Sequence, residues 1–543
     1  MRKTDEVIFV YDNTLEYPFP SRRNCVISKN GAVATSNPLA AQAGLDILKK
    51  GGNAVDAAIA TAICLTVVEP TSNGIGGDNF AIISKNGKIH GLNSSGYSPG
   101  GISVESLREK GLKQMPRFGW EPVTVPGAPK GWATCVEQFG KLTLSEVAQP
   151  AVEYAENGFP VQPTVSENWK RAAAIYQEYL KEFRFQNWFD TFLKNGKAPS
   201  AGELMFLPEH ADTIRKIADS NAETFYSGEL MEKIVRFSNE TGGYFTEEDF
   251  KTFSNDFVEP IGIDYRGYTI LEIPPNGQGI VALEALGILN GLAINRRDAG
   301  YYHNAIESIK LAFSDGKRYI TQADKMKVDF KRMLDSDYLA SRRKQITSNA
   351  MQPEPGSPEG SGTVYLATAD NEGNMVSFIQ SNYMGFGSGL VVPETGIGLQ
   401  NRGHSFSFNK TDANSLEPSK RPYHTIIPGF ITKGDRPIGP FGVMGGFMQP
   451  QGHLQVISNL IDFDMNPQVA LDAPRWQWMK DKEVVIEKAF PTETARALSR
   501  KGHKLSVFLN SGLFGRGQII LKNDRGLYVS GTEKRTDGCI AAY

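Results

Sequence analysis

The stretch Gly360-Ser361-Gly362-Thr363-Val364-Tyr365-Leu366-Ala367-Thr368 spans the sharpest change of composition in the chain. Residues 351–362 are rich in Pro, Gly and Ser, and such a run buries too little apolar surface to offset the entropy lost on ordering. Residues 364–369 are β-branched, aromatic or small and apolar, which predicts a buried strand. Residues 370–379 predict a turn and a returning strand. A flexible tether is therefore expected to run into a core hairpin, with Gly362-Thr363 at the junction.

The Gly362-Thr363 junction contains a candidate nucleophile, the Thr363 hydroxyl. A Thr hydroxyl is a weak nucleophile unless a base stands beside it. Cleavage before Thr363 would create an α-amine on the same residue, and a free α-amine has a pKa of about 8, which suits proton transfer at neutral pH. The alternative is a linker that ends at a strand whose first residue happens to be Thr, because Gly-Thr dipeptides are common.

Short motifs along nearly the whole chain favour the first interpretation. They are Gly51-Gly52-Asn53-Ala54-Val55-Asp56-Ala57-Ala58, Gly74-Ile75-Gly76-Gly77, Val125-Pro126-Gly127, Gly362-Thr363, Phe386-Gly387-Ser388-Gly389, Lys420-Arg421-Pro422, Gly445-Gly446, Ala473-Pro474-Arg475 and Lys501-Gly502-His503. In this order they resemble the γ-glutamyltranspeptidase family (gamma-glutamyltransferases, or glutathione hydrolases) of N-terminal-nucleophile hydrolases. The order is far more specific than any one motif.

The resemblance implies a fold and a reaction. The fold class would be α/β (α+β), a four-layer αββα sandwich, and self-cleavage would divide one composite domain into a large chain, 1–362, and a small chain, 363–543. The cleaved protein would be an N-terminal threonine amidohydrolase or acyltransferase that acts on γ-glutamyl or related amides through an acyl-enzyme. Its partners would be a small-molecule amide substrate and its own second chain, and a homo-oligomer is left open.

The resemblance also implies roles for residues of the reaction centre. Thr363 would be the nucleophile, after cleavage of its bond to Gly362. Gly445 and Gly446 match the family's pair of backbone N–H groups that bind the oxyanion, although two adjacent glycines alone indicate only a turn. Asn382 resembles the active-site Asn on the neighbouring strand, but the spacing from the preceding turn is one residue shorter than usual, and the difference is made up before Phe386.

The substrate-binding positions depart from the family's pattern. Where the family has an Arg that binds the α-carboxylate of a γ-glutamyl group, Ser95 stands nearest. Where it has a carboxylate that binds the α-amine, this chain has Ser405, and the family's Ser-Ser pair is His424-Thr425 here. Three parts of the amino-acid site are altered together.

These departures lead to a hypothesis about charge. Loss of the acid removes the counter-ion for an ammonium, whereas Arg402, His404 or His424 would still bind a carboxylate. A glutaryl-type acyl group would suit such a site, as in the cephalosporin acylase-like branch of the family. Three alternatives stay open: Arg402 and His404 are ordinary surface residues, the enzyme acts on γ-glutamyl groups, or the chain is a non-catalytic relative that binds a metabolite.

Composition bounds the remaining possibilities. The 58 Lys and Arg against 60 Asp and Glu give a net charge of −2, so whole-chain electrostatics favour neither nucleic acid nor a membrane surface. Four cysteines show no paired or metal-like spacing, and no cofactor or metal is expected. Residues 1–21 lack the pattern of a secretory signal, and no run approaches the ~20 apolar residues of a membrane span. These features predict a cytoplasmic protein, unlike the many exported members of the family.

Local patterns predict several elements. Asn30-Gly31 predicts a hairpin within residues 24–36, and Asn86-Gly87 predicts another between 79–84 and 88–93. Ser36 or Asn37 is expected to cap a helix. Residues 265–273 predict a strand. The Gly74-Ile75-Gly76-Gly77 motif predicts a tight turn and not a nucleotide-binding loop, because no strand precedes it and no Gly-Lys-Ser/Thr follows.

Overall fold

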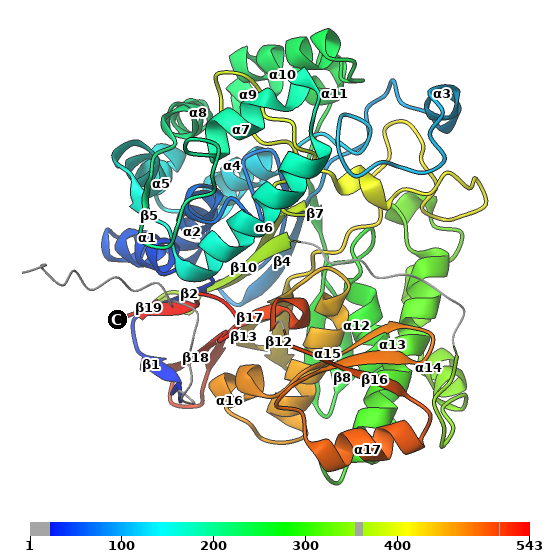
Figure 1. Cartoon of the computed structure of the whole chain (residues 1–543). Coiled ribbons are helices and arrows are strands. Elements are labelled where there is room, and N and C mark those ends of the chain that lie inside the picture. The colour runs from blue at the N-terminus through cyan, green and yellow to red at the C-terminus, as the bar shows by residue number, and fades with distance from the viewer. Residues whose placement is uncertain (1–21, 353–361, 510) are drawn as a thin grey trace, which may run out of the picture.

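Two seven-stranded sheets face each other, and helices cover the outer face of each (Figure 1). The computed structural model describes residues 22–352, 362–509 and 511–543. The first sheet runs in the order β19 (Cys539–Ala542), β2 (Ala32–Thr35), β10 (Gly362–Ala369), β11 (Met375–Tyr383), β3 (Asp78–Lys85), β4 (Lys88–Ser94) and β7 (Asp256–Val258). The second runs in the order β1 (Val26–Ser28), β18 (Tyr528–Thr532), β17 (Arg516–Lys522), β13 (Arg436–Met444), β12 (Gly429–Lys433), β9 (Tyr268–Glu272) and β8 (Ile261–Tyr265). The predicted four-layer αββα sandwich is confirmed.

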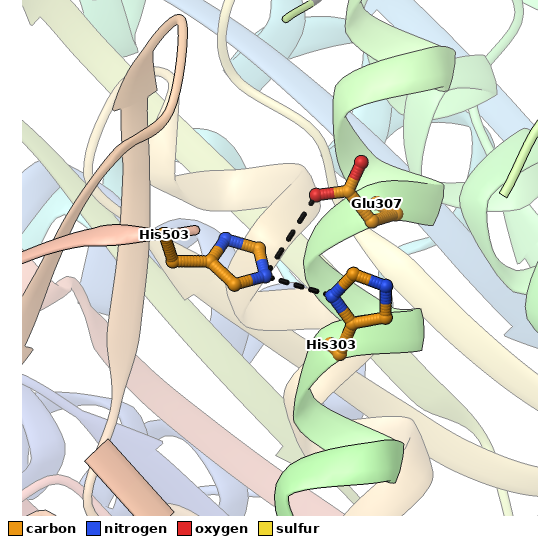
Figure 2. A group of neighbouring side chains, drawn as sticks. All are labelled: His303, Glu307 and His503. Atoms are coloured by element: carbon orange, nitrogen blue, oxygen red, sulfur yellow. Dashed lines mark hydrogen bonds and ion pairs between the residues drawn. The ribbon is translucent and has the colours of Figure 1, made fainter. Parts of the chain in front are cut away.

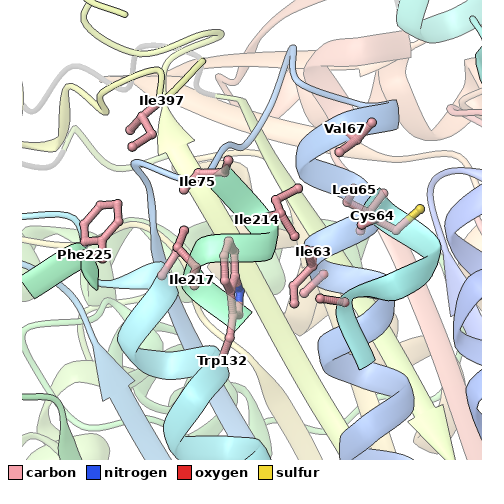
Figure 3. Close-up of a cluster of buried hydrophobic side chains, with 14 of the residues drawn as sticks. Ile63, Cys64, Leu65, Val67, Ile75, Trp132, Ile214, Ile217, Phe225 and Ile397 are labelled. Atoms are coloured by element: carbon pink, nitrogen blue, oxygen red, sulfur yellow. The ribbon is translucent and has the colours of Figure 1, made fainter. Parts of the chain in front are cut away.

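Helices of the N-terminal half cover the first sheet. They include α1 (Pro38–Lys49), α2 (Ala54–Val68), α4 (Ala128–Phe139), α5 (Leu144–Asn157) and α8 (Pro208–Asp219). Their apolar side chains form the largest core cluster of the described residues, part of which is shown in Figure 3, where Ile63 of α2, Trp132 of α4 and Ile214 of α8 converge. Trp132 also donates a hydrogen bond to Gln380 Oε1 of β11 (2.7 Å), which ties the helical layer to a central strand.

Two long helices, α12 (Gly279–Asn290) and α15 (Met448–Ile461), cover the second sheet, and a third, α13 (Ala299–Tyr319), packs against them. The remaining helices are α3 (Val104–Glu109), α6 (Pro163–Tyr179), α7 (Gln186–Phe192), α9 (Glu223–Ser227), α10 (Glu229–Glu240), α11 (Glu247–Lys251), α14 (Ser336–Arg343), α16 (Pro467–Asp472) and α17 (Thr492–Arg500). A small sheet contains β14 (Trp476–Lys480), β15 (Glu483–Glu487) and β16 (Lys504–Phe508), and β5 (Phe159–Pro160) pairs with β6 (Leu204–Met205).

The predicted hairpin after Thr363 is confirmed and is anchored at its turn. β10 and β11 pair antiparallel at the centre of the first sheet. At their turn, Asp370 Oδ2 accepts a hydrogen bond from the first amide of α2, Ala54 N (2.8 Å). Asn53 and Asp56 form a capping box at the same helix end, so the Gly51–Ala58 motif builds a helix N-terminus that holds the hairpin.

Other local predictions divide into confirmed and wrong ones. Asn37 caps α1, and β3 and β4 pair across Asn86-Gly87, both of which have positive φ as a type I′ turn requires. The strand predicted at 265–273 is present as β9 (Tyr268–Glu272), but it begins later than predicted, because Arg266-Gly267 makes a similar turn between β8 and β9.

Two strands flank Asn30-Gly31, β1 and β2, but the hairpin predicted from them is wrong. β1 pairs with β18 in the second sheet, whereas β2 pairs with β10 and β19 in the first, so the chain crosses between the sheets there. The turn signal was local, but β2 pairs with strands that lie more than 300 residues away in the sequence.

The structure bears on the predictions about membrane spans and cysteines. No helix of the described residues is long and apolar enough to cross a membrane. All four cysteines are free thiols. Most of the predicted tether, residues 353–361, and the N-terminal residues 1–21 lie outside the described part of the chain.

The two sheets pack closely where Gly442 of β13 faces Tyr365 of β10. A Cβ added at Gly442 would lie 2.4 Å from the Tyr365 ring, whose hydroxyl is hydrogen-bonded to Ser377 Oγ (2.8 Å) and cannot easily retreat. Gly442 therefore sets the distance between the sheets beside the Thr363 strand.

We predict that Gly442→Ala destabilises the protein by about 1–3 kcal/mol, the usual range for overpacking a core. The midpoint of thermal unfolding measures the effect. Gly398→Ala is the matched control, because a Cβ at Gly398 meets nothing nearer than 3.9 Å. Equal midpoints for the two variants would contradict this account of the inter-sheet packing.

Candidate active site

Thr363 lies in an irregular position at the start of β10. Gly362 pairs with Tyr383 and Val364 pairs with Gln380, so two residues of β11, Ser381 and Asn382, lie opposite Thr363 alone and form a β-bulge. Bulges often re-aim a side chain beside an active site. Tyr383 has a φ of 75°, which is unusual for a residue other than glycine, and Thr363 is fully buried at 0 % exposure.

A chain of hydrogen bonds joins Thr363 to a buried arginine. Thr363 Oγ1 lies 3.2 Å from Ser381 Oγ of β11, and Arg402 Nη2 donates to the same Ser381 oxygen (3.2 Å). Arg402 Nη1 donates to Thr425 Oγ1 at 2.7 Å. The guanidinium lies 4.3 Å from the centre of the Tyr383 ring. Ser381 thus places a cation one hydroxyl away from Thr363.

Arg402 is a buried cation. It is 0 % exposed, makes no ion pair with any described residue, and its Nε has no hydrogen-bond partner. Burial lowers the pKa of the guanidinium to about 10, with Tyr383 and Asp78 acting in the opposite direction, so Arg402 stays charged at neutral pH. A buried charge without a counter-ion is costly, and a site built around one is suited to an anion. The alternative that Arg402 is an ordinary surface residue is therefore wrong.

Gly445 and Gly446 form a sharp turn between β13 and α15. Their φ angles are 138° and 60°, and a Cβ at Gly445 would lie 3.0 Å from Gly515 Cα, so glycine is required there. Gln278 Nε2 donates to the carbonyls of Gly446 (2.8 Å) and Thr425 (2.6 Å). The Gly446 carbonyl is thus held by a hydrogen bond. Neither the Gly445 amide nor the Gly446 amide makes a hydrogen bond with a described residue.

Two of the sequence motifs support these groups from behind. Arg475, from Ala473-Pro474-Arg475, donates to the carbonyls of Phe514 (2.9 Å) and Gly515 (3.0 Å), the segment that packs behind Gly445. The Gly74–Gly77 turn packs against Asn382, because a Cβ at Gly74 or Gly77 would lie within 3.0 Å of the Asn382 amide group. Asn382 Oδ1 is buried without a hydrogen-bond partner in the described residues.

The other predicted substrate residues are distributed differently. Ser95 Oγ donates to Asn93 Oδ1 (2.7 Å) inside the fold. His424 lies 3.1 Å from Asp78 Oδ2 through Nε2 and faces Ile426 N through Nδ1, so both ring nitrogens are engaged. Burial and the charge of Arg402 lower the pKa of His424 to about 3. Thr425 joins the site as the partner of Arg402.

His404 and Ser405 line a pocket of about 480 Å³ outside the buried centre. Its wall includes Tyr383 and Tyr423, and Phe447, which directly follows Gly446. His404 Nδ1 faces the carbonyls of Met115 (2.9 Å) and Pro116 (3.1 Å), so Nδ1 carries the proton in the neutral ring. The pocket thus borders β11, the strand paired with that of Thr363, and the residue that follows the glycine pair.

Comparison with known proteins decides the family. The model of the gamma-glutamyltranspeptidase family matches residues 40–543. The chain belongs to the gamma-glutamyltranspeptidase family. It is accordingly an enzyme of the N-terminal-nucleophile type, an amide hydrolase or acyltransferase that arises from a self-processing precursor.

Members of this family with different named activities resemble the chain. A cephalosporin acylase from Bacillus halodurans has a crystal structure that is 56 % identical, with a TM-score of 0.96, over 98 % of this chain and 99 % of that one. The glutathione hydrolase-like YwrD proenzyme of Bacillus subtilis (strain 168) is 36 % identical over 94 % of this chain and 98 % of its own length. The oxamate amidohydrolase proenzyme of Klebsiella pneumoniae is 31 % identical over 95 % and 99 %.

A second cluster of polar side chains lies between α13 and the loop after α17 (Figure 2). His303 and Glu307 stand one turn apart on α13, and His503 approaches them from the C-terminal part of the chain. His303 Nδ1 lies 2.9 Å from His503 Nε2, and Glu307 Oε1 lies 3.8 Å from the same nitrogen. Sequence reasoning missed the cluster, although the His303–Glu307 spacing of four residues was visible.

Hydrogen bonding accounts for this cluster without a metal ion. His303 Nε2 faces the Thr347 carbonyl (2.8 Å), which can only accept, so the neutral ring has a bare Nδ1 that accepts from His503 Nε2–H. Lys310 Nζ already occupies Glu307 Oε1 at 2.7 Å. Burial is the main cause that lowers the pKa of His303, and it lowers the pKa of His503 to about 3. Both rings are therefore neutral at neutral pH.

This neutrality predicts a pH effect on stability. Below pH ~6.5 His503 binds a proton in the unfolded chain but not in the folded chain. The free energy of unfolding therefore falls as the pH drops from about 6.5 towards 3, and the contribution of His503 is fully present above that window. His503→Gln should reduce this slope by about 1.4 kcal/mol per pH unit, because Gln does not titrate but still donates to His303. Thermal unfolding midpoints of both proteins between about pH 8 and pH 4 test it. Parallel curves would show that His503 is not held neutral.

Proposed function

We propose that Thr363 cleaves the chain after Gly362 and then, as the N-terminal residue, hydrolyses amides whose acyl group ends in a carboxylate, such as glutaryl amides. The observation that carries this proposal is Arg402, a buried guanidinium that forms no ion pair with any described residue and is joined to Thr363 through Ser381. Transfer of the acyl group to an amine instead of water would use the same intermediate.

The first reaction is an intramolecular acyl shift. The Thr363 hydroxyl attacks the Gly362 carbonyl, the C–N bond breaks, and the Thr363 nitrogen takes up the proton as an amine. Water then hydrolyses the ester to a Gly362 carboxylate and the free Thr363 hydroxyl. The products are chains of 362 and 181 residues (543 − 362). The β11 bulge opposite Thr363 supports this step, because it interrupts the regular ladder of hydrogen bonds at that residue.

The second reaction uses the new α-amine as the base. It takes the proton of the Thr363 hydroxyl as that oxygen attacks the substrate amide, and it passes the proton to the leaving amine. The amides of Gly445 and Gly446, which make no hydrogen bond with a described residue, are the donors for the oxyanion, and loss of one such donor typically slows a reaction by about 10²–10³-fold. Water then hydrolyses the acyl-enzyme.

The choice of acyl group rests on charge. A γ-glutamyl group carries an α-ammonium as well as a carboxylate, and Ser405 supplies no negative charge where the family has an acid. Arg402 matches the carboxylate alone through a charge-assisted hydrogen bond. The acylase named among the similar structures supports this assignment. So does the relative named for oxamate, a compound that carries a carboxylate and no ammonium.

The strand order supports association of the two chains after cleavage. In the first sheet, β10 and β11 of the small chain lie between β2 and β3 of the large chain. In the second sheet, β12 of the small chain pairs with β9, and β18 pairs with β1. Separation would expose both sheet interiors, so we expect the chains to remain one composite domain.

Processing is tested first, by the intact mass of the purified protein. We expect two chains that separate between Gly362 and Thr363, and a single uncleaved chain for Thr363→Ala. Thr363→Ser is the matched control, because it keeps the hydroxyl and should still cleave. A native chain that stays whole after long incubation would leave Thr363 without its base and favour a non-catalytic, metabolite-binding relative.

Acyl specificity is tested with glutaryl and γ-glutamyl anilides of the same aniline. We expect a higher kcat/KM for the glutaryl compound, and a loss of about 10–10²-fold on that substrate for Arg402→Met, the range for a lost charge-assisted hydrogen bond. Arg402→Lys keeps the charge without the two-pronged geometry and should fall between them. A strong γ-glutamyl preference of the native enzyme would replace the acylase by a glutathione hydrolase-like activity.

A further inference from the structure

The reaction centre around Thr363 and Arg402 is closed to solvent. Thr363, Ser381 and Arg402 are each 0 % exposed. The neighbouring pocket of about 480 Å³ includes none of these three residues in its wall. An acyl carboxylate that arrives through the pocket therefore has no open path to the Arg402 guanidinium, and a side chain must move to admit it.

Tyr383 is the side chain that contacts both the pocket and the guanidinium. It lines the pocket, and the centre of its ring lies 4.3 Å from the guanidinium carbon of Arg402. The negative face of an aromatic ring attracts a cation, and the attraction is stronger where water is excluded. The ring thus covers one face of Arg402 and contacts the cation in place of an anion.

The backbone of Tyr383 links this contact to the uncleaved chain. Its φ of 75° is rare for an aromatic residue, and such a conformation persists only where its surroundings fix it. Tyr383 N donates a hydrogen bond to Ser381 Oγ (2.8 Å), and Tyr383 pairs with Gly362 across the two strands. Gly362 directly precedes the proposed cleavage site, so cleavage would release one of the two contacts that fix Tyr383.

We propose that Tyr383 is a gating residue for the acyl site. In the uncleaved chain its ring keeps anions away from Arg402, and release of Gly362 lets the ring turn away so that an acyl carboxylate takes its place. This inference rests on the proposed function for the position of the cleavage. It ties access to Arg402 to one side chain, whereas the rest of the pocket wall is not required to move.

Accessibility of Arg402 can be measured without a substrate. Phenylglyoxal modifies accessible guanidinium groups, and peptide mass mapping reports Arg402 separately, with the exposed Arg496 as internal reference. Because modification requires the open state, we expect Arg402 to react at least about tenfold more slowly in uncleaved Thr363→Ala than in the processed enzyme. Thr363→Ala/Tyr383→Gly should lose most of this protection. Thr363→Ala/Tyr383→Phe keeps the ring and should retain it.

The variants are chosen so that a folding defect is not mistaken for an open gate. Gly and Asn both tolerate a positive φ, so Tyr383→Gly and Tyr383→Asn remove the ring without adding backbone strain, and both should expose Arg402. Gln114→Ala is the matched control, because Gln114 lines the same pocket but is exposed. It should leave Arg402 protected in the Thr363→Ala background.

Glutarate binding, measured by isothermal titration calorimetry, separates this inference from the proposed function. We expect Thr363→Ala/Tyr383→Gly to bind glutarate at least about tenfold more tightly than Thr363→Ala, and the addition of Arg402→Met to remove this gain. Faster modification of Arg402 without glutarate binding would support the gate and contradict the proposed acyl group. Equal modification of Arg402 in Thr363→Ala with and without the Tyr383 ring overturns the inference, whether or not glutarate binds.

Discussion

The pairing of β10 with β11 is the constraint on which the reaction centre depends. Alternation along β11 sends Gln380 and Asn382 to the helical side, where they meet Trp132 and the Gly74–Gly77 turn. Ser381 points to the opposite face, towards Thr363 and Arg402. One face of β11 thus links Thr363 to Arg402, and its other face packs against the helical layer. A slip by one residue would exchange these two sets.

Electrostatics around Arg402 explain why a single cation is tolerated there. Asp78, its long-range counter-charge, accepts hydrogen bonds from the amides of Gly96 and Gly127 and from Gln400 Nε2, and faces His424. His424 remains neutral, so no second positive charge adds to the cost of burial. The hydroxyls of Ser381 and Thr425 orient the guanidinium but do not neutralise it. Burial of the Arg402 guanidinium therefore costs desolvation free energy, which an ion pair with an acyl carboxylate would offset.

The fold could be predicted from the sequence because the motifs determine local structure. The capping box at Asn53, the turns at Asn86-Gly87 and Gly445-Gly446, and the hairpin after Thr363 are each specified by neighbouring residues. The two sheet neighbours of β2 could not be found in this way, because they are set by strands hundreds of residues apart.

The substrate-binding side chains were harder to predict for the same reason. Arg402 was a candidate, but its burial and its link to Thr363 through Ser381 depend on three separate segments.

The link between Thr363 and Arg402 also bears on the base of the proposed reaction. An α-amine in water has a pKa of about 8 and is mostly protonated at neutral pH, a form that cannot accept the hydroxyl proton. Cleavage at Gly362 would create this amine at a residue that is fully buried, one hydroxyl away from a guanidinium. Burial and a neighbouring like charge both disfavour the ammonium form. The same cation that selects an anionic acyl group would thereby keep the Thr363 amine neutral, which is the state in which it acts as a base.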